Sequence, residues 1–170
     1  MRVLVVACHP LQDSFHHAVR ARVLAGLDTG GHEARLIDLY AIGFDPVMSV
    51  AERTRYHEAG VNETGIAEHL DALRWCEALV FVYPTWWYGL PAMLKGWLDR
   101  VWATDVAFSL SADGGIVPRM THIRRIGIVT TCGASWFLSH LIGHPGRKTI
   151  LRGIRALCGP RCRTLFMAHY

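Results

Sequence analysis

The chain lacks any apolar run long enough to cross a membrane, and the apolar stretch between Arg2 and His9 is too short for the hydrophobic part of a secretion signal. Its five cysteines are an odd number at scattered positions, and Cys158 and Cys162 do not have the spacing of a zinc or redox pair. These absences predict a cytoplasmic protein with free thiols and without a metal site.

Signatures for phosphate and nucleic-acid binding are also missing. There is no Gly-x-Gly-x-x-Gly, which argues against a Rossmann dinucleotide site, and no Gly-x-x-x-x-Gly-Lys, which excludes a P-loop. Arg147, Lys148, Arg152 and Arg155 recur with helical spacing, so they indicate a solvated helix face and not a nucleic-acid stripe. The net charge of +4 is modest, but it still favours anionic ligands such as nucleotides.

What the chain does have is enough apolar material for one core. It contains 170 residues, 51% of them hydrophobic and 19% charged, which predicts a single domain over residues 1–170. The clearest segment is 79–83, a short run of β-branched and aromatic residues typical of a strand buried on both faces. Pro84 ends it, and Pro91 begins a helix whose apolar positions lie three or four residues apart.

Strands and helices are expected to alternate along the chain, which is typical of an α/β fold with a parallel sheet. Five strands in one domain favour the flavodoxin-like doubly wound order 2-1-3-4-5. The strands are expected at 2–8, 33–39, 79–83, 123–130 and 163–169, with helices over 15–27, 63–76, from Pro91 onward and 147–157. Three long connections remain: 40–61, with a short helix near 51–57, 104–121 and 131–146.

The end of the chain at Tyr170 leaves no room for a helix after the fifth strand. A doubly wound sheet needs helices on both faces, so we expect this final helix to be absent and Leu165 or Phe166 to be exposed. Exposed apolar surface of this kind often marks an interface, which predicts a homodimer. The connections 40–61 and 104–121 would then cross to the partner.

In the predicted fold, the loops after the first, third and fourth strands converge at one sheet edge. The first of them, residues 9–14, ends at a helix amino terminus that attracts anions. Ser14 adds a hydroxyl there, and His9 adds a ring that can donate to a phosphate oxygen. The alternative is that Ser14 is a plain N-cap and His9 a turn residue.

The other two loops carry aromatic and small residues. Trp86, Trp87 and Tyr88 could form one wall for a flat heteroaromatic ring, although the tryptophans could instead cap the core. After the fourth strand, the small residues that follow Thr131 would let the backbone approach a ligand closely. Trp136 and His144 could face the opposite side of that ring, or they could be a core and a loop residue. An anion seat, an aromatic wall and a glycine-lined edge together describe a flavin nucleotide site.

Three motifs carry a resemblance to the NAD(P)H:quinone oxidoreductase family of flavodoxin-like quinone reductases. They are Ala7-x-His9-Pro10 with Ser14-Phe15, the long run Pro84-x-Trp86-Trp87-Tyr88-Gly89-x-Pro91 with its following helix, and Thr130-Thr131-x-Gly133. The middle motif is the most specific. His144-Pro145-Gly146 also resembles small members that act as ancillary flavoproteins of potassium efflux systems. Cys132 departs from the usual Thr-Thr-Gly-Gly.

The resemblance implies roles for individual residues. The flavin phosphate end would be held by His9, Ser14 and Phe15, the isoalloxazine by Pro84, Thr85, Trp86, Trp87 and Tyr88, and its pyrimidine and ribityl side by Thr130, Thr131 and Gly133. His144 fits the family's catalytic histidine, and Trp136 or Phe137 occupies the position of its tyrosine.

The resemblance also implies an activity. NAD(P)H would reduce bound FMN or FAD, and a quinone or similar acceptor would then take the two electrons at the same place in a ping-pong mechanism. Two alternatives remain: a regulatory flavoprotein subunit that contacts a membrane potassium transporter, and a flavodoxin-type electron carrier.

Overall fold

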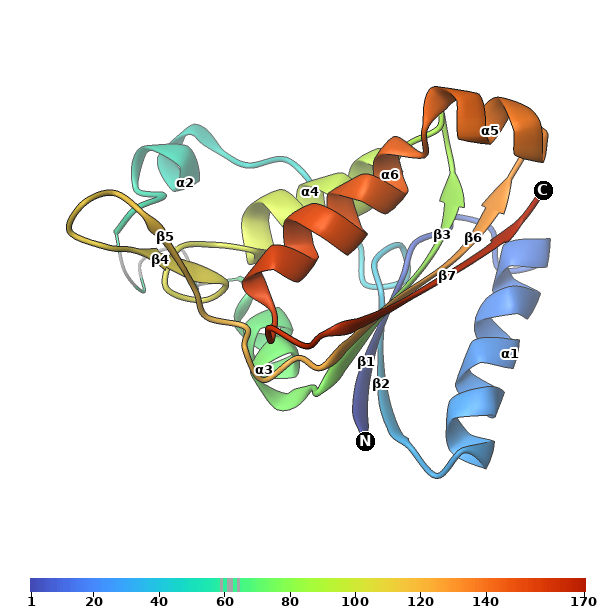
Figure 1. Ribbon diagram of the computed structural model, residues 1–170, viewed down its shortest axis with the longest axis horizontal. Helices are drawn as coiled ribbons and strands as arrows, with labels where there is room; N and C mark the ends of the chain where they lie inside the picture. Colours follow the sequence, from blue (N-terminus) through green and yellow to red (C-terminus); the bar gives the residue numbers. More distant parts are fainter. Residues whose placement is uncertain (59, 61–62, 64) are drawn as a thin grey trace.

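The computed structural model describes residues 1–170 apart from 59, 61, 62 and 64, and its centre is a parallel sheet of five strands (Figure 1). The observed order is β2-β1-β3-β6-β7, which confirms the predicted order 2-1-3-4-5. Each pair of neighbouring strands is parallel. The strands are β1 (Arg2–Ala7), β2 (Glu33–Asp38), β3 (Ala78–Thr85), β6 (Arg125–Cys132) and β7 (Arg163–His169).

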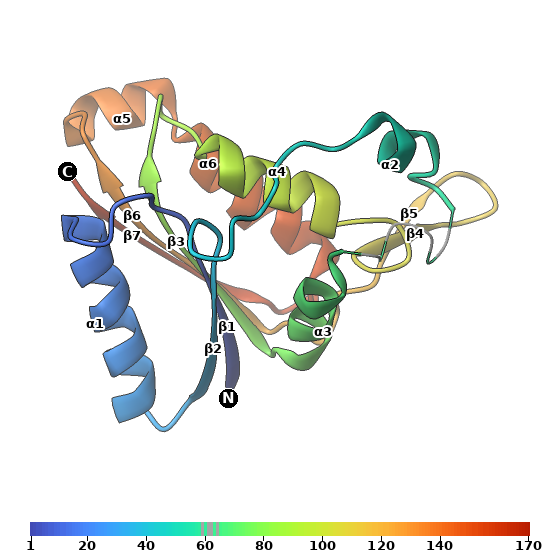
Figure 2. The same cartoon turned by 180° about the vertical axis from the view of Figure 1, so that it is seen from behind.

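Helices lie on both faces of this sheet, with α1 (Phe15–Thr29) on one side and α3 (Ala67–Trp75), α4 (Ala92–Val101) and α6 (Pro145–Lys148) on the other (Figures 1 and 2). Side chains alternate along each strand, so every central strand supplies two cores. In β1, Val3 and Val5 pack toward α1, whereas Leu4 and Val6 belong to the larger core. In the larger core, the indole N–H of Trp97 on α4 donates to Nδ1 of His69 on α3 at 3.2 Å.

The connection that follows β2 lies across α4. It contains α2 (Val50–Thr54), close to the short helix expected near 51–57, and Ser49 caps that helix in a capping box with Glu52. Gly96 on α4 permits the contact, because a Cβ at this position would overlap the carbonyl of Pro46. Residues 59 and 61 of the expected connection, and residue 64 of the helix expected over 63–76, lie outside the described residues.

Two of the expected connections contain structure of their own. The segment 104–121 holds an antiparallel hairpin of β4 (Phe108–Leu110) and β5 (Ile116–Pro118). The segment 131–146 holds α5 (Trp136–Ile142), so the expectation of a loop there was wrong. In α5 only Ser139 is buried, so the helix has no stripe of buried apolar residues. Without such a stripe, hydrophobic periodicity in the sequence does not predict the helix.

The helix expected over 147–157 begins two residues earlier, at Pro145, and is not uniform. After α6 it widens into a π-helical stretch, Thr149–Gly153, and tightens into a 3₁₀ turn, Ile154–Leu157. On β7, the side chain of Leu165 is exposed, as is that of Met167, whereas Phe166 packs against the larger core. Leu165 is therefore the residue of the expected pair that faces solvent. All five cysteines are free thiols.

Candidate functional site

The loop after β1 is held by its own side chains. Ser14 is the N-cap of α1: its Oγ accepts the His17 N–H at 3.2 Å and donates to the Leu11 carbonyl at 2.8 Å. The Leu11 N–H donates to Nδ1 of His9 at 3.1 Å. A neutral His9 ring that accepts at Nδ1 carries its proton on Nε2, which leaves one ring donor for a ligand. Ser14 thus does act as an N-cap, and His9 keeps a free donor.

His16 is a neighbour of this loop that the sequence reading missed. It is only 4% exposed, both ring nitrogens are buried, and the backbone of Val82 lies beside the ring. Its ring stacks on His9 with 5.1 Å between centroids. Burial lowers the pKa of His16 to about 4, so the ring is neutral at pH 7. His16 lies seven residues before Val23, which is two helical turns, and Val23 is on the inner face of α1. This spacing could have predicted from the sequence that His16 faces inward.

The loop after β3 is a tight turn from Trp86 to Gly89. The Gly89 N–H donates to the Trp86 carbonyl at 3.0 Å, and the two central residues, Trp87 and Tyr88, have positive φ angles of 48° and 62°. This is a type I′ turn, which ordinarily places glycine or asparagine at these positions. Aromatic residues held there are strained, and such strain clusters at functional sites.

The turn projects its rings away from the core. Trp87 is 95% exposed and Trp86 is 42% exposed, so the alternative that both tryptophans cap the core was wrong. The ring of Trp86 lies 6.4 Å from that of His9, which brings the loops after β1 and β3 together.

A hollow of about 430 Å³ opens between the loops after β3 and β6, and we call it the aromatic hollow. It is lined by Thr85, Trp87, Tyr88, Cys132, Gly133, Ala134, Leu138 and Ser139. The strand ends beneath it are tied by the hydroxyls of Thr85 and Thr130, which are 2.8 Å apart. Four of the predicted flavin-binding residues, Thr85, Trp87, Tyr88 and Gly133, therefore line one hollow.

The other predicted flavin-binding residues surround this arrangement. Pro84 and Thr130 are buried at the ends of β3 and β6, and Thr131 follows half-buried. Phe15 is exposed, and its ring lies 5.1 Å from that of His169 at the end of β7. The predicted residues thus share the carboxyl edge of the sheet, as the fold requires.

Of the two predicted catalytic residues, Trp136 lines a second hollow, of about 440 Å³, which we call the histidine hollow. His144 does not line it but contacts its lining residues His140, Phe166 and Tyr170. The lining of the histidine hollow is formed by Trp136, His140, Arg147, Leu151, Thr164, Phe166, Ala168 and Tyr170. Helix α5 separates it from the aromatic hollow, because Trp136 and His140 line one and Leu138 and Ser139 line the other. The structure does not bring Trp136 or His144 into the aromatic hollow, and their catalytic role stays a prediction.

His144 is itself buried, with a positive φ of 48°. Its Nε2 lies 3.3 Å from the Tyr170 hydroxyl and 3.4 Å from Nδ1 of His140. Burial lowers the pKa of His144, and electrostatic repulsion of its charged form by the neighbouring His140, Arg147 and Lys148 lowers it further. The segment after His144 packs closely on the loop after β3. At Gly146 the two backbones come so near that an added Cβ would lie only 3.2 Å from the Gly89 carbonyl carbon.

Tyr170 was not singled out from the sequence as a site residue. The resemblance places the counterpart of the family's tyrosine at Trp136 or Phe137, but the phenol beside His144 comes from Tyr170, which follows β7. The parallel register pairs Thr131 with His169, so this chain end lies at the same edge as the loop after β6. That register places Tyr170 close to His144.

Comparison with known proteins agrees with this architecture. A solved NAD(P)H:quinone oxidoreductase from Methanothermobacter marburgensis superposes with a TM-score of 0.84 at 27% identity, covering 99% of this chain and 85% of that one. The NAD(P)H dehydrogenase (quinone) 1 of Rattus norvegicus is 27% identical over 93% of this chain and 65% of its own length. The NAD(P)H oxidoreductase YcaK of Escherichia coli strain K12 is 30% identical over 75% of this chain and 64% of its own.

These curated relatives are longer than the present chain, which spans less than two thirds of each. The family model described as "Flavodoxin-like fold" matches residues 1–169, almost the whole chain. The protein therefore belongs to the flavodoxin-like fold family and has NAD(P)H quinone oxidoreductases among its relatives.

Proposed function

We propose that this protein is a flavin-dependent oxidoreductase that transfers electrons from NAD(P)H to a quinone or similar aromatic acceptor. The observation that carries the proposal is the aromatic hollow, where a strained turn holds Trp87 and Tyr88 open to solvent beside the small residue Gly133. A hollow with an aromatic wall and a close backbone edge suits a flat heteroaromatic ring. The relatives named as NAD(P)H quinone oxidoreductases support the same activity.

The residues present fit the phosphate end of a flavin, FMN or FAD. The amino terminus of α1 points unpaired N–H groups at the loop after β1, which favours a phosphate there. Nε2 of His9, whose Nδ1 is engaged within the loop, would provide a donor in the same place. The ring of His16 is buried and stacks on His9, so it would support that donor from behind.

When bound, the flavin would supply two-electron hydride transfer, and the chain would position it and control access. Thr85, Trp87 and Tyr88 would hold the ring edge and exclude water from one side. His144 lies outside the aromatic hollow, so it would act on an acceptor that reaches past α5 toward the histidine hollow. With the Tyr170 hydroxyl donating to its Nε2, the neutral ring carries its proton on Nδ1. That proton could be donated to the oxygen of the acceptor as it takes up electrons.

Binding and turnover together test the proposal. The protein at micromolar concentration should quench the fluorescence of FMN or FAD, and the loaded protein should oxidise NADH or NADPH with a simple quinone in a ping-pong pattern. Binding without turnover would favour the flavodoxin-type carrier. Turnover that rises on addition of a copurifying membrane transporter would favour the regulatory subunit. Absence of flavin binding would remove the proposal.

A further inference from the structure

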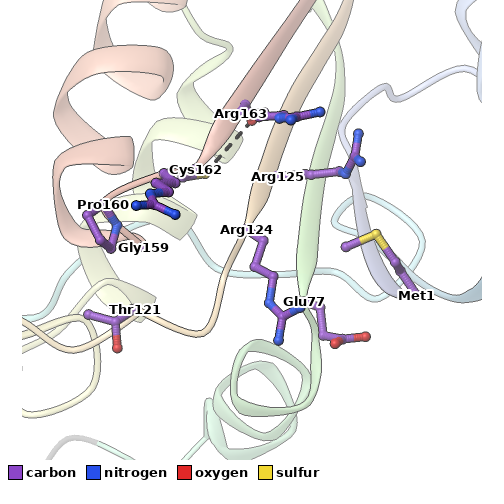
Figure 3. A pocket seen from close by; sticks show the side chains of 10 residues that line it. Met1, Glu77, Thr121, Arg124, Arg125, Gly159, Pro160, Cys162 and Arg163 are labelled. Atoms are coloured by element: carbon purple, nitrogen blue, oxygen red, sulfur yellow. Dashed lines mark hydrogen bonds between the residues drawn. The ribbon is translucent and has the colours of Figure 1, made fainter.

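A third hollow lies at the amino-terminal end of the sheet, opposite the aromatic hollow (Figure 3). We call it the arginine hollow; its volume is about 660 Å³, in the range of small-molecule sites. It is lined by Met1, Glu77, Thr121, Arg124, Arg125, Gly159, Pro160, Arg161, Cys162 and Arg163. Four of these ten residues are arginines, and none of the predicted flavin-binding or catalytic residues is among them.

The backbone around the arginine hollow is fixed by hydrogen bonds between strand starts. The Arg124 N–H donates to the Glu77 carbonyl at 2.8 Å, and the Arg163 N–H donates to the Arg124 carbonyl at 2.9 Å. On the far wall, the Gly159 N–H donates to the Ile123 carbonyl at 3.1 Å, and a Cβ on Gly159 would lie only 2.8 Å from the Thr121 carbonyl oxygen. The arginines therefore rise from a rigid frame, which lowers the entropy lost when a ligand binds.

The charge of this frame is unbalanced. None of Arg124, Arg125, Arg161 and Arg163 forms an ion pair within the described part of the chain. The carboxylate of Glu77 accepts the Arg2 N–H at 3.1 Å and lies 3.8 Å from the Arg2 guanidinium. The lining residues therefore comprise four arginines and one glutamate, an excess of three positive charges, and the glutamate is already paired with Arg2 outside the hollow.

Two of the arginines are forced into proximity by the sheet itself. Arg125 and Arg163 are register partners on the parallel strands β6 and β7, and their side chains extend in the same direction (Figure 3). Neighbouring strands are about 4.8 Å apart, so these like charges repel each other. An anion between them would convert this repulsion into two charge-assisted contacts.

We propose that the arginine hollow binds a small molecule carrying a chain of two or more phosphate groups, such as tripolyphosphate or a nucleoside triphosphate. The planar fork of arginine matches phosphate oxygens bidentately, and an excess of three positive charges among the lining residues suits a ligand with several negative ones. A nucleic acid would need a longer track of phosphate contacts than one bounded hollow with four arginines provides. The site does not depend on the flavin or on the proposed enzymatic activity.

Isothermal titration of the full chain with inorganic tripolyphosphate tests the site, with excess FMN present to occupy any phosphate seat at α1. We expect saturable binding that weakens as salt is added. The double variant Arg125→Gln/Arg163→Gln should bind on the order of tenfold or more weakly. The matched variant Arg22→Gln/Arg152→Gln removes the same charge from exposed positions outside the hollow and should bind as the wild type does.

A thermal-shift measurement shows whether a variant that fails to bind tripolyphosphate is still folded. Tripolyphosphate should raise the melting temperature of the wild type and of the control variant but not that of Arg125→Gln/Arg163→Gln, which should still fold because it loses a repulsive pair. Three results would overturn the proposal: no heat of binding at millimolar tripolyphosphate, an equal loss of binding in both double variants, or tighter binding of a 20-nucleotide single strand than of tripolyphosphate and ATP.

Discussion

At the scale of single residues, the carboxyl edge of the sheet depends on histidines whose protonation is set by burial. His16 and His144 are both buried, and both have a lowered pKa with burial as the first cause. Sequence reasoning selected His144 through its motif and missed His16, because a histidine in the first turn of a helix looks like an exposed polar residue. The seven-residue spacing to Val23 is consistent with an inward position, and the packing of α1 on β1 and β3 shows that His16 faces inward.

His16 makes stability depend on pH. Its pKa falls from 6.5 to about 4 on folding, so between these values the unfolded chain binds a proton that the folded protein does not. Stability should therefore fall as the pH drops from about 6.5 toward 4, by about 3 kcal/mol over the whole window. Urea unfolding across this range measures the loss. His16→Asn should remove this part of the slope, whereas His57→Asn should keep it; equal slopes in the wild type and His16→Asn would contradict the assignment.

His144 tests the acceptor side of the proposed function. If it donates a proton to the acceptor, His144→Ala should slow quinone reduction by a factor on the order of 10²–10⁴ while flavin affinity stays close to wild type. Tyr170→Phe keeps the ring but removes the hydroxyl that lies 3.3 Å from Nε2, so it should cost less. Stopped-flow reduction and reoxidation separate the two half-reactions. A parallel loss of flavin affinity and turnover in His144→Ala would make this histidine structural.

At the scale of elements, α4 and the connection that follows β2 pack so closely at Gly96 that no side chain fits there. Gly96 in α4 faces Pro46, and a Cβ there would overlap the proline carbonyl, so Gly96→Ala should destabilise the protein by about 1–3 kcal/mol through overpacking. Gly26 in α1 is the matched control, because nothing lies within 4 Å of its Cβ position. Gly26→Ala should stabilise by about 0.5–1 kcal/mol through helix propensity. Thermal unfolding of both variants measures this, and equal effects would contradict the contact.

Some helices and strands could be predicted from the sequence, and others could not. Buried strands are continuous apolar runs, so segments such as 79–83 were recognisable and their alternation with helices predicted the sheet order. Helix α5 and the β4–β5 hairpin were missed because they are short and mostly exposed, so neither has a buried periodic face. The pairing of Tyr170 with His144 depends on the register of β6 and β7, which no local pattern encodes.

At the scale of the whole molecule, exposed apolar residues gather on two elements that flank α4. Phe137 and Leu141 on α5 are 69% and 71% exposed, and Val47 and Val50 at α2 are 67% and 85% exposed. Helices α5 and α2 lie on the same side of the molecule, at either end of α4 (Figures 1 and 2). The α5 part of this surface lies at the edge that carries the aromatic hollow and the α2 part at the far end of α4, and exposed apolar surface of this kind favours contact between two copies.

We therefore expect a homodimer in which this surface is buried. A stable two-fold pair typically buries roughly 1,500 Å² or more, enough to cover both flanking elements and to place the connection that contains α2 near the partner's hollow. Sedimentation at micromolar protein should give a dimer, and Leu141→Glu/Val50→Glu should give a folded monomer with weaker flavin binding. Leu165→Glu changes an equally apolar but distant position on β7 and should leave the dimer intact. A wild-type monomer that binds flavin and reduces quinone would end this expectation, and a monomer produced only by Leu165→Glu would move the interface to β7.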